Sequence, residues 1–266
     1  MTELRYSVEA YNAASLSENK IHEDAVARRF GFRGGLVPGV DVYGYMTHLP
    51  VLRWGRAWLE RGTALCRFLK PVYDGDLAAV SAEESAEGLA LRLDSHDELC
   101  ATGEAALPPG PPAIPAAFAE APRPPAPPAA RPPADETTLA PGIWLAMTPI
   151  AMTPDHAAEA LSDLRESLPL YAAEGLVHPA VVLRAGNWVL RDNVTLGPWM
   201  HVGSRIRHFA ALRIGDELSA RGRVTANYEK KGHRFVECDV LVYANESAPI
   251  ARIAHIAIYR PRQVAE

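Results

Sequence analysis

The strongest constraint on the fold of this chain is an internal repeat. Identical residues recur 140 positions apart in its two halves. They mark the start of an apolar segment, a strand-like segment and a Gly-Asp turn, and the pairs are Gly35-Leu36-Val37 with Gly175-Leu176-Val177, Val42 with Val182, Arg67 with Arg207, and Gly75-Asp76 with Gly215-Asp216. One spacing shared by unrelated features indicates duplication rather than chance. We therefore predict two copies of one domain of roughly 110–120 residues.

A stretch rich in proline and alanine, between Leu107 and Pro133, separates the two copies. Proline fixes φ and lacks a backbone N–H donor, so we expect neither a helix nor a central strand here. An extended surface connector, partly polyproline II, is predicted instead, and a docking site for a proline-binding partner is the alternative. The predicted parts are an N-terminal domain over 1–107, a linker over 108–139 and a C-terminal domain over 140–266.

Both copies show the same order of elements. A polar, partly helical region (19–30 and 155–173) precedes an apolar segment (40–59 and 180–190) whose low charge indicates burial on nearly all sides. Strand-like segments with turns follow, at 64–69, 77–82, 89–93 and 101–107 in the first copy and at 205–212, 217–228, 234–244 and 250–259 in the second. One central helix wrapped by an antiparallel sheet is an α+β architecture. Two copies would pair their sheets edge to edge and form an intramolecular pseudo-dimer.

The stretch from Ser17 to Gly39 carries the chemistry. His22 ends a polar loop, and Pro38-Gly39 opens the first apolar segment. An imidazole with a pKa near neutrality suits proton transfer. Unpaired N–H groups at a helix start favour developing negative charge, and glycine lets a ligand approach the backbone closely. We therefore predict that His22 is an acid/base residue and that the Gly39 N–H is an oxyanion donor.

These residues resemble a known family. The resemblance is carried by Asn19-Lys20-Ile21-His22, Ala27, Gly31-Phe32 and Pro38-Gly39, with support from Lys70-Pro71-Val72 and Gly75-Asp76. Together they are similar to the MaoC-like (R)-specific enoyl-CoA hydratases in their tandem form. The resemblance covers both halves except the linker. It implies a double hotdog fold, hydratase or dehydratase activity on acyl thioesters, and a role for Asn19 near the reacting water.

One position departs from the family pattern. In the family motif, approximately Asp-x-Asn-Pro-Ile/Leu-His, a catalytic Asp stands five residues before the His. Ser17 occupies that position here, and Lys20 replaces the usual Pro. A serine cannot act as a carboxylate base. Either one of four nearby carboxylates substitutes, or His22 works alone, or hydratase activity is lost; the four are Glu18, Glu23, Asp24 and Asp41.

The second copy departs further from the pattern. Ser162 stands 140 residues after His22, and His178-Pro179 replaces Pro38-Gly39. We therefore predict one active site per chain, in the N-terminal half. The C-terminal copy would contribute walls of the acyl tunnel, for example Trp188 and Val189. His178 is expected to be structural, since it lacks an acidic partner nearby in the sequence.

Several further residues are candidates for binding the substrate. They are Pro38, Val40, Asp41, Tyr43 and Arg207. Core packing is the simpler role for Tyr43. The strand positions Arg205, Arg207, His208 and Arg213 suit the phosphates of coenzyme A or of a phosphopantetheine arm, although solvated charges on a strand are the simpler interpretation. His48 and Cys66 are expected to be buried core residues rather than reactive groups.

Composition excludes other classes of function. A net charge of −5 gives no reason to expect nucleic acid or anionic lipid as a partner. Three scattered cysteines favour a reducing cytoplasm over a disulfide framework. We expect no signal peptide and no membrane span. Metal-binding motifs and Gly-rich nucleotide motifs are absent from the sequence, so we expect neither a metal nor a cofactor.

Three functions remain. The leading prediction is a lyase of fatty acid metabolism that hydrates enoyl thioesters, or dehydrates 3-hydroxyacyl thioesters, on coenzyme A or an acyl carrier. The second is a thioesterase that uses Asp41 or Glu18 as base or nucleophile. The third is a non-catalytic subunit that binds acyl thioesters. Assembly of the pseudo-dimer into a homodimer is left open by the sequence.

Overall fold

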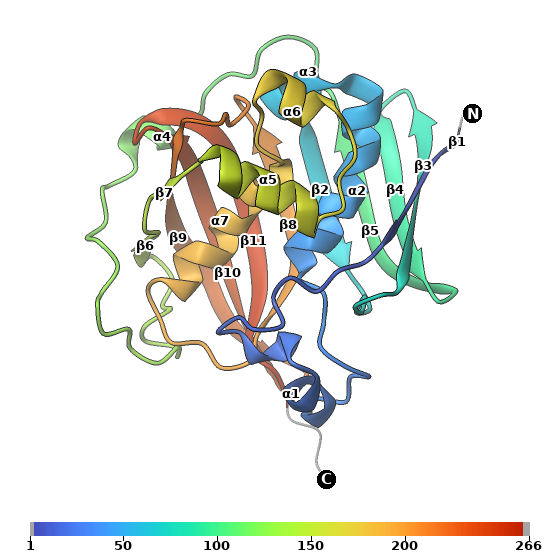
Figure 1. Cartoon of the computed structure of the whole chain (residues 1–266). Coiled ribbons are helices and arrows are strands. Elements are labelled where there is room, and N and C mark those ends of the chain that lie inside the picture. The colour runs from blue at the N-terminus through green and yellow to red at the C-terminus, as the bar shows by residue number, and fades with distance from the viewer. Residues whose placement is uncertain (1–2, 263–266) are drawn as a thin grey trace.

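The computed structural model describes residues 3–262, and its main feature is one continuous antiparallel sheet (Figure 1). Its strands run in the order β1-β3-β4-β5-β2-β8-β11-β10-β9-β6, with β7 paired separately to β9. The first half supplies β1 (Glu3–Glu9), β2 (Thr63–Phe68), β3 (Leu77–Ser85), β4 (Gly88–Ser95) and β5 (Glu98–Ala106). The second supplies β6 (Trp144–Ala146), β7 (Ile150–Ala151), β8 (Met200–His208), β9 (Glu217–Lys230), β10 (His233–Ala244) and β11 (Ala248–Arg260). Seven of the eight expected strands lie close to their expected ranges. The strand expected at 205–212 instead runs from Met200 to His208 as β8, and β1, β6 and β7 were not anticipated.

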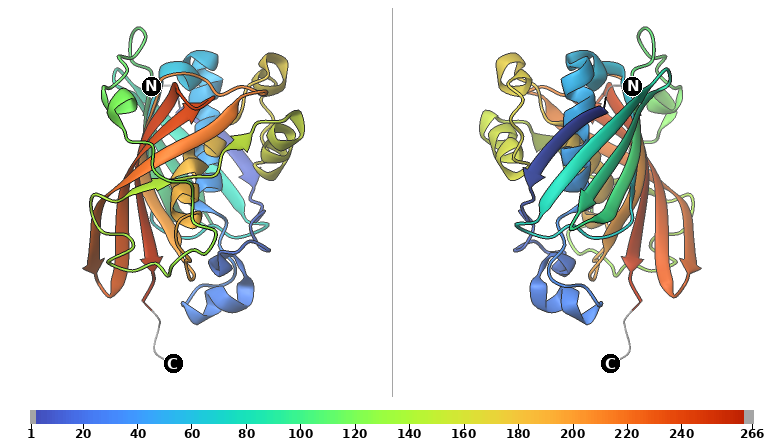
Figure 2. Two further views of the ribbon diagram at one scale, coloured as in Figure 1. Left: turned by 90° about the vertical axis from the view of Figure 1, so that its left-hand side faces the viewer. Right: turned by 90° about the vertical axis from the view of Figure 1, so that its right-hand side faces the viewer.

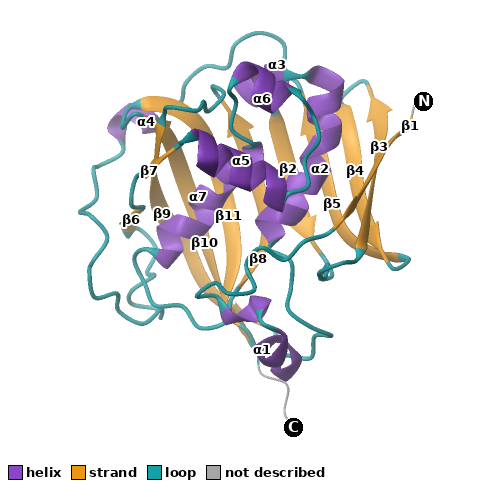
Figure 3. Cartoon of the chain, viewed as in Figure 1, coloured by secondary structure: helices purple, strands orange, loops and turns teal. Residues whose placement is uncertain are grey.

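Two central helices, α2 (Gly39–Trp54) and α7 (Pro179–Arg191), lie on one side of this sheet, which curves around them (Figures 2 and 3). The polar regions before them form short helices, as expected. These are the 3-10 turn η1 (Lys20–His22) and α1 (Asp24–Arg29) in the first half, and α5 (Pro154–Asp163) and α6 (Leu170–Glu174) in the second. Within residues 3–262, no helix has the length and apolar character needed to cross a membrane.

The two halves join through β2 and β8. Leu65 pairs with Arg205, its counterpart 140 residues later, and the antiparallel register extends from there to Thr63 with Arg207. Each strand therefore pairs with its own repeat across a pseudo-two-fold axis. This pairing confirms the predicted pseudo-dimer and leaves neither of these two strands as a free edge.

Helix α2 is buried on all sides, as its low charge indicated. Every residue from Val40 to Val51 is buried. The expectation of one apolar helix over 40–59 was wrong at its end, because Gly55 has a φ of +58° and divides it into α2 and α3 (Arg56–Arg61). Glycine takes up this conformation without the steric penalty of a Cβ.

Close packing at Gly44 brings the two halves together. A Cβ on Gly44 would lie 2.6 Å from Leu164 Cδ2 and 3.3 Å from Ala180 Cβ. Ala180 belongs to the first turn of α7, and Leu164 ends α5. Any side chain at position 44 would therefore push the central helices apart, and glycine allows them to pack directly against each other.

The linker is docked on the second half rather than fully extended. The expectation that no helix forms in it was wrong for α4 (Ala117–Glu120), because residues 116–121 contain no proline. Phe118 of α4 is buried, and its ring packs edge-on against Phe209 at 5.2 Å and Tyr243 at 5.3 Å. The Tyr243 hydroxyl also donates a hydrogen bond to the Phe118 carbonyl at 3.1 Å. This cluster anchors the middle of the linker.

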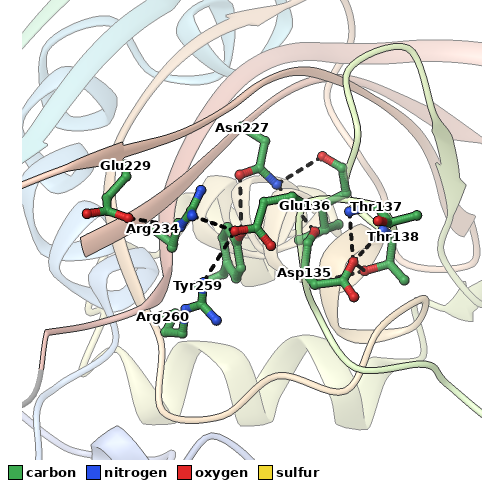
Figure 4. Close-up of polar contacts among 10 residues, drawn as sticks. Asp135, Glu136, Thr137, Thr138, Asn227, Glu229, Arg234, Tyr259 and Arg260 are labelled. Carbon is green, nitrogen blue, oxygen red and sulfur yellow. Dashed lines mark hydrogen bonds and ion pairs between the residues drawn. The ribbon is translucent and has the colours of Figure 1, made fainter. Parts of the chain in front are cut away.

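The end of the linker is fastened to β9, β10 and β11 (Figure 4). Glu136 accepts ionic contacts from Arg234 at 2.6 Å and from Arg260 at 3.4 Å. The Asn227 amide donates to the Leu139 carbonyl at 3.1 Å. These contacts fix the chain where it enters the second domain.

We predict that Phe118→Ala lowers the free energy of unfolding by about 3 kcal/mol and exposes the linker to elastase beside Ala117 and Ala119, because the variant loses the buried ring. Ile114→Ala is the matched control, since Ile114 lies in the same linker but is 49% exposed; we expect a change below about 0.5 kcal/mol. Denaturant titration and limited proteolysis measure both effects. Equal effects of the two substitutions would show that the linker is not docked.

Candidate active site

Asn19 connects the two halves at the predicted site. Its amide nitrogen donates to the Trp199 carbonyl at 3.0 Å, and its side-chain oxygen accepts from the Trp199 N–H at 3.1 Å. The same oxygen caps the η1 turn by accepting from the Ile21 N–H at 3.3 Å. The amide nitrogen also lies 3.1 Å from His22 Nε2. Asn19 therefore holds His22 against the second half.

The ring of His22 is fixed on both nitrogens. Nδ1 lies 2.6 Å from the Leu36 carbonyl, which can only accept, so Nδ1 carries the proton. Nε2 then has a lone pair and accepts from the Asn19 amide. The backbone of His22 is also tightly packed against Gly35, because a Cβ at position 35 would lie 2.1 Å from the His22 carbonyl oxygen. The fold thus selects the tautomer in which Nε2 can act as a base.

The start of α2 is open. Its N-cap is Pro38, which has no side-chain acceptor, so the first N–H groups of the helix receive no side-chain cap. Gly39 is the first helical residue, and a Cβ there would lie 3.1 Å from Phe68 and 3.3 Å from His201 Nδ1. A side chain at position 39 would crowd Phe68 and His201, and glycine leaves the backbone open to the smaller cavity.

The start of α7 is closed by contrast. His178 is its N-cap, and its Nδ1 accepts from the Ala180 N–H at 3.1 Å. The Glu166 carboxylate lies 3.6 Å from His178 Nε2 and 3.0 Å from His48 Nδ1. Burial raises the pKa of Glu166, but its ionic contact with His178 and its hydrogen bond with His48 outweigh burial, and the net pKa is lowered. His178 was expected to be structural because no acidic partner lies nearby in the sequence, but the loop before α6 brings Glu166 to it.

Two cavities meet at His22. The larger, of about 480 Å³, adjoins both central helices, and the smaller, of about 340 Å³, extends along β2 and β8. Five residues line both cavities, namely Asn19, His22, Pro38, Asn187 and Trp199. A ligand at this junction would contact His22 and the start of α2 together, with room for a chain on either side.

Three carboxylates line the larger cavity with His22, namely Glu18, Asp41 and Asp163, and the first two have arginine partners. Glu18 pairs with Arg131 of the linker at 2.6 Å, and Asp41 pairs with Arg184 of α7 at 2.5 Å. Asp41 is only 1% exposed, and its second oxygen, Oδ2, has no hydrogen-bond partner among residues 3–262. Asp41 is therefore the fully buried carboxylate with a free acceptor at this cavity, whereas Asp163 is half-buried and its pKa is raised by burial and by the nearby Asp41 charge.

The other candidates for the missing acid are placed differently. Ser17 lines the larger cavity, but its hydroxyl donates to the Asn19 carbonyl at 3.4 Å. Asp24 accepts from the Gly35 N–H at 2.7 Å and pairs with Arg28, and Glu23 pairs with Lys20. Asp24 and Glu23 line neither of the two cavities.

The predicted substrate-binding residues divide into two groups. Pro38, Val40 and Asp41 line the larger cavity. Tyr43 and Arg207 line neither of the two cavities; Tyr43 is 1% exposed in the core, and Arg207 is exposed on β8 with its guanidinium near Phe209. The apolar packing of α2 and the outward alternation of β8 explain these two placements.

Other predicted roles can be compared with the structure. Trp188 lines the larger cavity, whereas Val189 faces away and packs against Gly222 of β9. His48 is a buried histidine with a satisfied partner, as expected. Burial raises the pKa of the Cys66 thiol to about 12, which matches its expected inert role.

Several residues that line the two cavities come from the second half and were missed by sequence reasoning. They include Asp163, Arg184, Asn187, Trp199 and His201. Trp199 and His201 lie around the start of β8, and Asn187 lies on α7. No motif marks them, because their role depends on the pairing of β2 with β8.

Neither known protein families nor curated proteins give a sequence match to this chain. Solved structures do match its fold. A conserved hypothetical protein from Mycobacterium tuberculosis, described as having a double hotdog fold, superposes with a TM-score of 0.66 at 16% identity over 97% of this chain and 95% of its own. This chain has a double hotdog fold.

Other structures that match over nearly the whole chain carry functional descriptions. A protein from Chloroflexus aurantiacus described as a MaoC domain dehydratase matches with a TM-score of 0.64 at 10% identity, over 99% of this chain and 95% of its own. A Novosphingobium aromaticivorans protein described as a thioesterase matches with a TM-score of 0.54 at 13% identity, over 96% and 95%. The expected likeness to MaoC-like proteins is confirmed at the level of the fold. At these identities the reaction has to be argued from the residues of this double hotdog chain.

The electrostatics of His22 give a direct test of this site. Burial lowers its pKa below the usual value near 6.5, and this outweighs the Leu36 carbonyl and the Asp41 charge, which both raise it. We predict an imidazole titration midpoint below about 6.5, and a lower midpoint still in Asp41→Asn, which removes a favourable negative charge. Side-chain NMR titration measures both. Glu18→Gln is the control, because the Glu18 charge is already paired with Arg131. A midpoint that rises in Asp41→Asn would contradict the geometry.

Proposed function

We propose that this double hotdog protein is an acyl-thioester hydratase or dehydratase. The observation that carries the proposal is the junction at His22, where an unprotonated Nε2 and the uncapped start of α2 border the same space. Hydration of an enoyl thioester needs a base for water and a donor for the thioester oxygen. The likeness to structures described as MaoC dehydratases supports this class of reaction.

The proposed hydration uses His22 for both proton transfers. Nε2 takes a proton from a water molecule as the water oxygen bonds to C3 of the enoyl group. The electron pair of the C2–C3 double bond moves toward the thioester oxygen, where the Gly39 N–H stabilises the charge. The imidazolium then delivers the proton to C2 and the carbonyl re-forms. One water has been added, and His22 is neutral again. Dehydration is the same path in reverse.

Asn19 and Asp41 would support these transfers without replacing His22. Asn19 keeps the imidazole at the junction through its four contacts with the loop and Trp199. The negative charge of Asp41 favours the imidazolium that forms transiently. This arrangement makes a carboxylate at the position of Ser17 unnecessary, because one residue serves in turn as base and acid.

Hydrolysis of the thioester is the second candidate function. It is favoured by one specific observation: Asp41 Oδ2 is buried at the larger cavity without a partner among residues 3–262, so it could activate water against the thioester carbon. The ion pair with Arg184 at 2.5 Å weakens it as a base or nucleophile. We therefore place hydration first.

We predict that His22→Gln lowers kcat/KM for hydration of a short enoyl-CoA by about 10²-fold or more, since the amide cannot exchange the proton. Loss of the enoyl absorbance and release of free thiol are followed in the same assay. His156→Gln is the control, because His156 lies on α5 and lines neither of the two cavities. Unchanged hydration in His22→Gln would contradict the proposal. Thiol release that disappears in Asp41→Asn would identify a thioesterase instead.

The lowered pKa of His22 sets the expected pH dependence. The neutral imidazole is the active base in hydration, and it is lost as the pH falls through its pKa. We therefore predict that kcat/KM falls only below about pH 6.5, the ordinary histidine value. Measurement of kcat/KM against pH locates this acid limb. An acid limb above that value would exclude a buried neutral His22 as the base.

A further inference from the structure

His201 is a second histidine beside the start of α2. It lies on β8, in the second half, and lines the smaller cavity together with His22 and Gly39. Its Nδ1 is 3.3 Å from the position that a Cβ on Gly39 would occupy. The ring is held edge-on by Phe68, with ring centroids 4.9 Å apart. The fold therefore places an imidazole where the first N–H groups of α2 meet the cavity.

A buried chain of hydrogen bonds orients this imidazole. His201 Nε2 lies 2.8 Å from the Ser204 hydroxyl, and the same hydroxyl lies 3.1 Å from His255 Nδ1. All three side chains are buried. Burial, together with the neighbouring His255, lowers the pKa of His201, so the ring is neutral and carries one proton. When the hydroxyl donates to His201 Nε2 and accepts from His255, that proton is on Nδ1.

The Nδ1 atom of His201 has no internal partner. It is buried, the residue is 8% exposed, and no other group among residues 3–262 forms a hydrogen bond with Nδ1. An unpaired buried donor is costly in a folded protein and calls for a partner such as water, an ion or a bound ligand. The open helix start and the unpaired imidazole are independent features, and both point to an acceptor atom between them.

We propose that His201 donates its Nδ1–H to the thioester carbonyl oxygen and so completes an oxyanion hole with the Gly39 N–H. The inference rests on the proposed function and deepens it, because the ligand is the carbonyl of an acyl thioester. Each half then contributes one donor to the same oxygen: the first half gives a backbone N–H and the second gives a side chain. The C-terminal copy is therefore part of the active site and more than a wall.

His201→Asn and His201→Gln, which are similar in polarity, distinguish donation to the substrate oxygen from a purely structural role of His201. Asparagine places its amide nitrogen near the position of Nδ1, whereas glutamine places it near Nε2 and keeps only the contact with Ser204. We expect His201→Gln to lose about 10²-fold in kcat for hydration of crotonyl-CoA, typical of a missing oxyanion donor, with little change in KM. His201→Asn should stay within about tenfold of the wild type. If His201 only supported Ser204 and His255, glutamine would be the better replacement.

His208→Ala is the matched control for folding. His208 is a buried histidine on the same strand, it packs against Trp58, and it lines neither cavity. This variant should lose thermal stability and keep its kcat. The inference is overturned if His201→Gln turns over like the wild type, or if His201→Asn is as impaired as His201→Gln. Absence of hydration by the wild type would instead overturn the proposed function, and the two failures are thus distinguishable.

Discussion

The pairing of β2 with β8 is the interaction on which the rest of the structure depends. It joins two sheets at equivalent strands, so that Leu65 faces Arg205, its own repeat. The same junction sets α2 against α7, where Gly44 leaves no room for a side chain. It also brings the start of β8 to the loop of Asn19. The duplicated chain thus achieves internally what separate subunits would achieve by association.

The two central helices differ at their starts, and the proposed site lies at the start that is open. Helix α7 is capped by His178, and Glu166 occupies the space beside it. Helix α2 begins with Pro38, which offers no cap, and its first turn borders a cavity. Unpaired N–H groups and the helix dipole favour negative charge at such a start. In the proposed account, the first copy therefore carries the chemistry, and the second has a capped, structural version of the same helix start.

Much of this arrangement could be read from the sequence. The offset of 140 residues predicted two copies of one fold and the pairing of their sheets, because repeated turns and apolar starts have a direct local signature; the pairing of β2 with β8 confirms this. His22 and Gly39 could be found because a histidine and a helix-opening Pro-Gly pair mark their own chemistry. Tyr43 and Arg207 were predicted as binding residues, but the structure places neither at the cavities. Tyr43 faces the core and Arg207 faces solvent. Which way each side chain faces depends on helix packing and strand register, and the spacing of residues in the sequence does not reveal either.

The contacts between distant segments could not be predicted. Asn19 reaches Trp199, Glu18 reaches Arg131, and Asp41 reaches Arg184 only after the halves have paired. His201 has no neighbouring motif, and Glu166 reaches His178 through a loop of irregular backbone. The sequence therefore identified one side of the site, and the folded chain was needed to show that the other side is also polar.

The central account is that one site, at the start of α2, is built by both halves. A crystal structure with a bound saturated acyl-CoA, which can bind but not be hydrated, tests it most directly. The account predicts that the thioester oxygen lies within hydrogen-bond distance of the Gly39 N–H, with C3 of the acyl group next to His22 Nε2. A thioester bound at the start of α7, or away from both central helices, would contradict it.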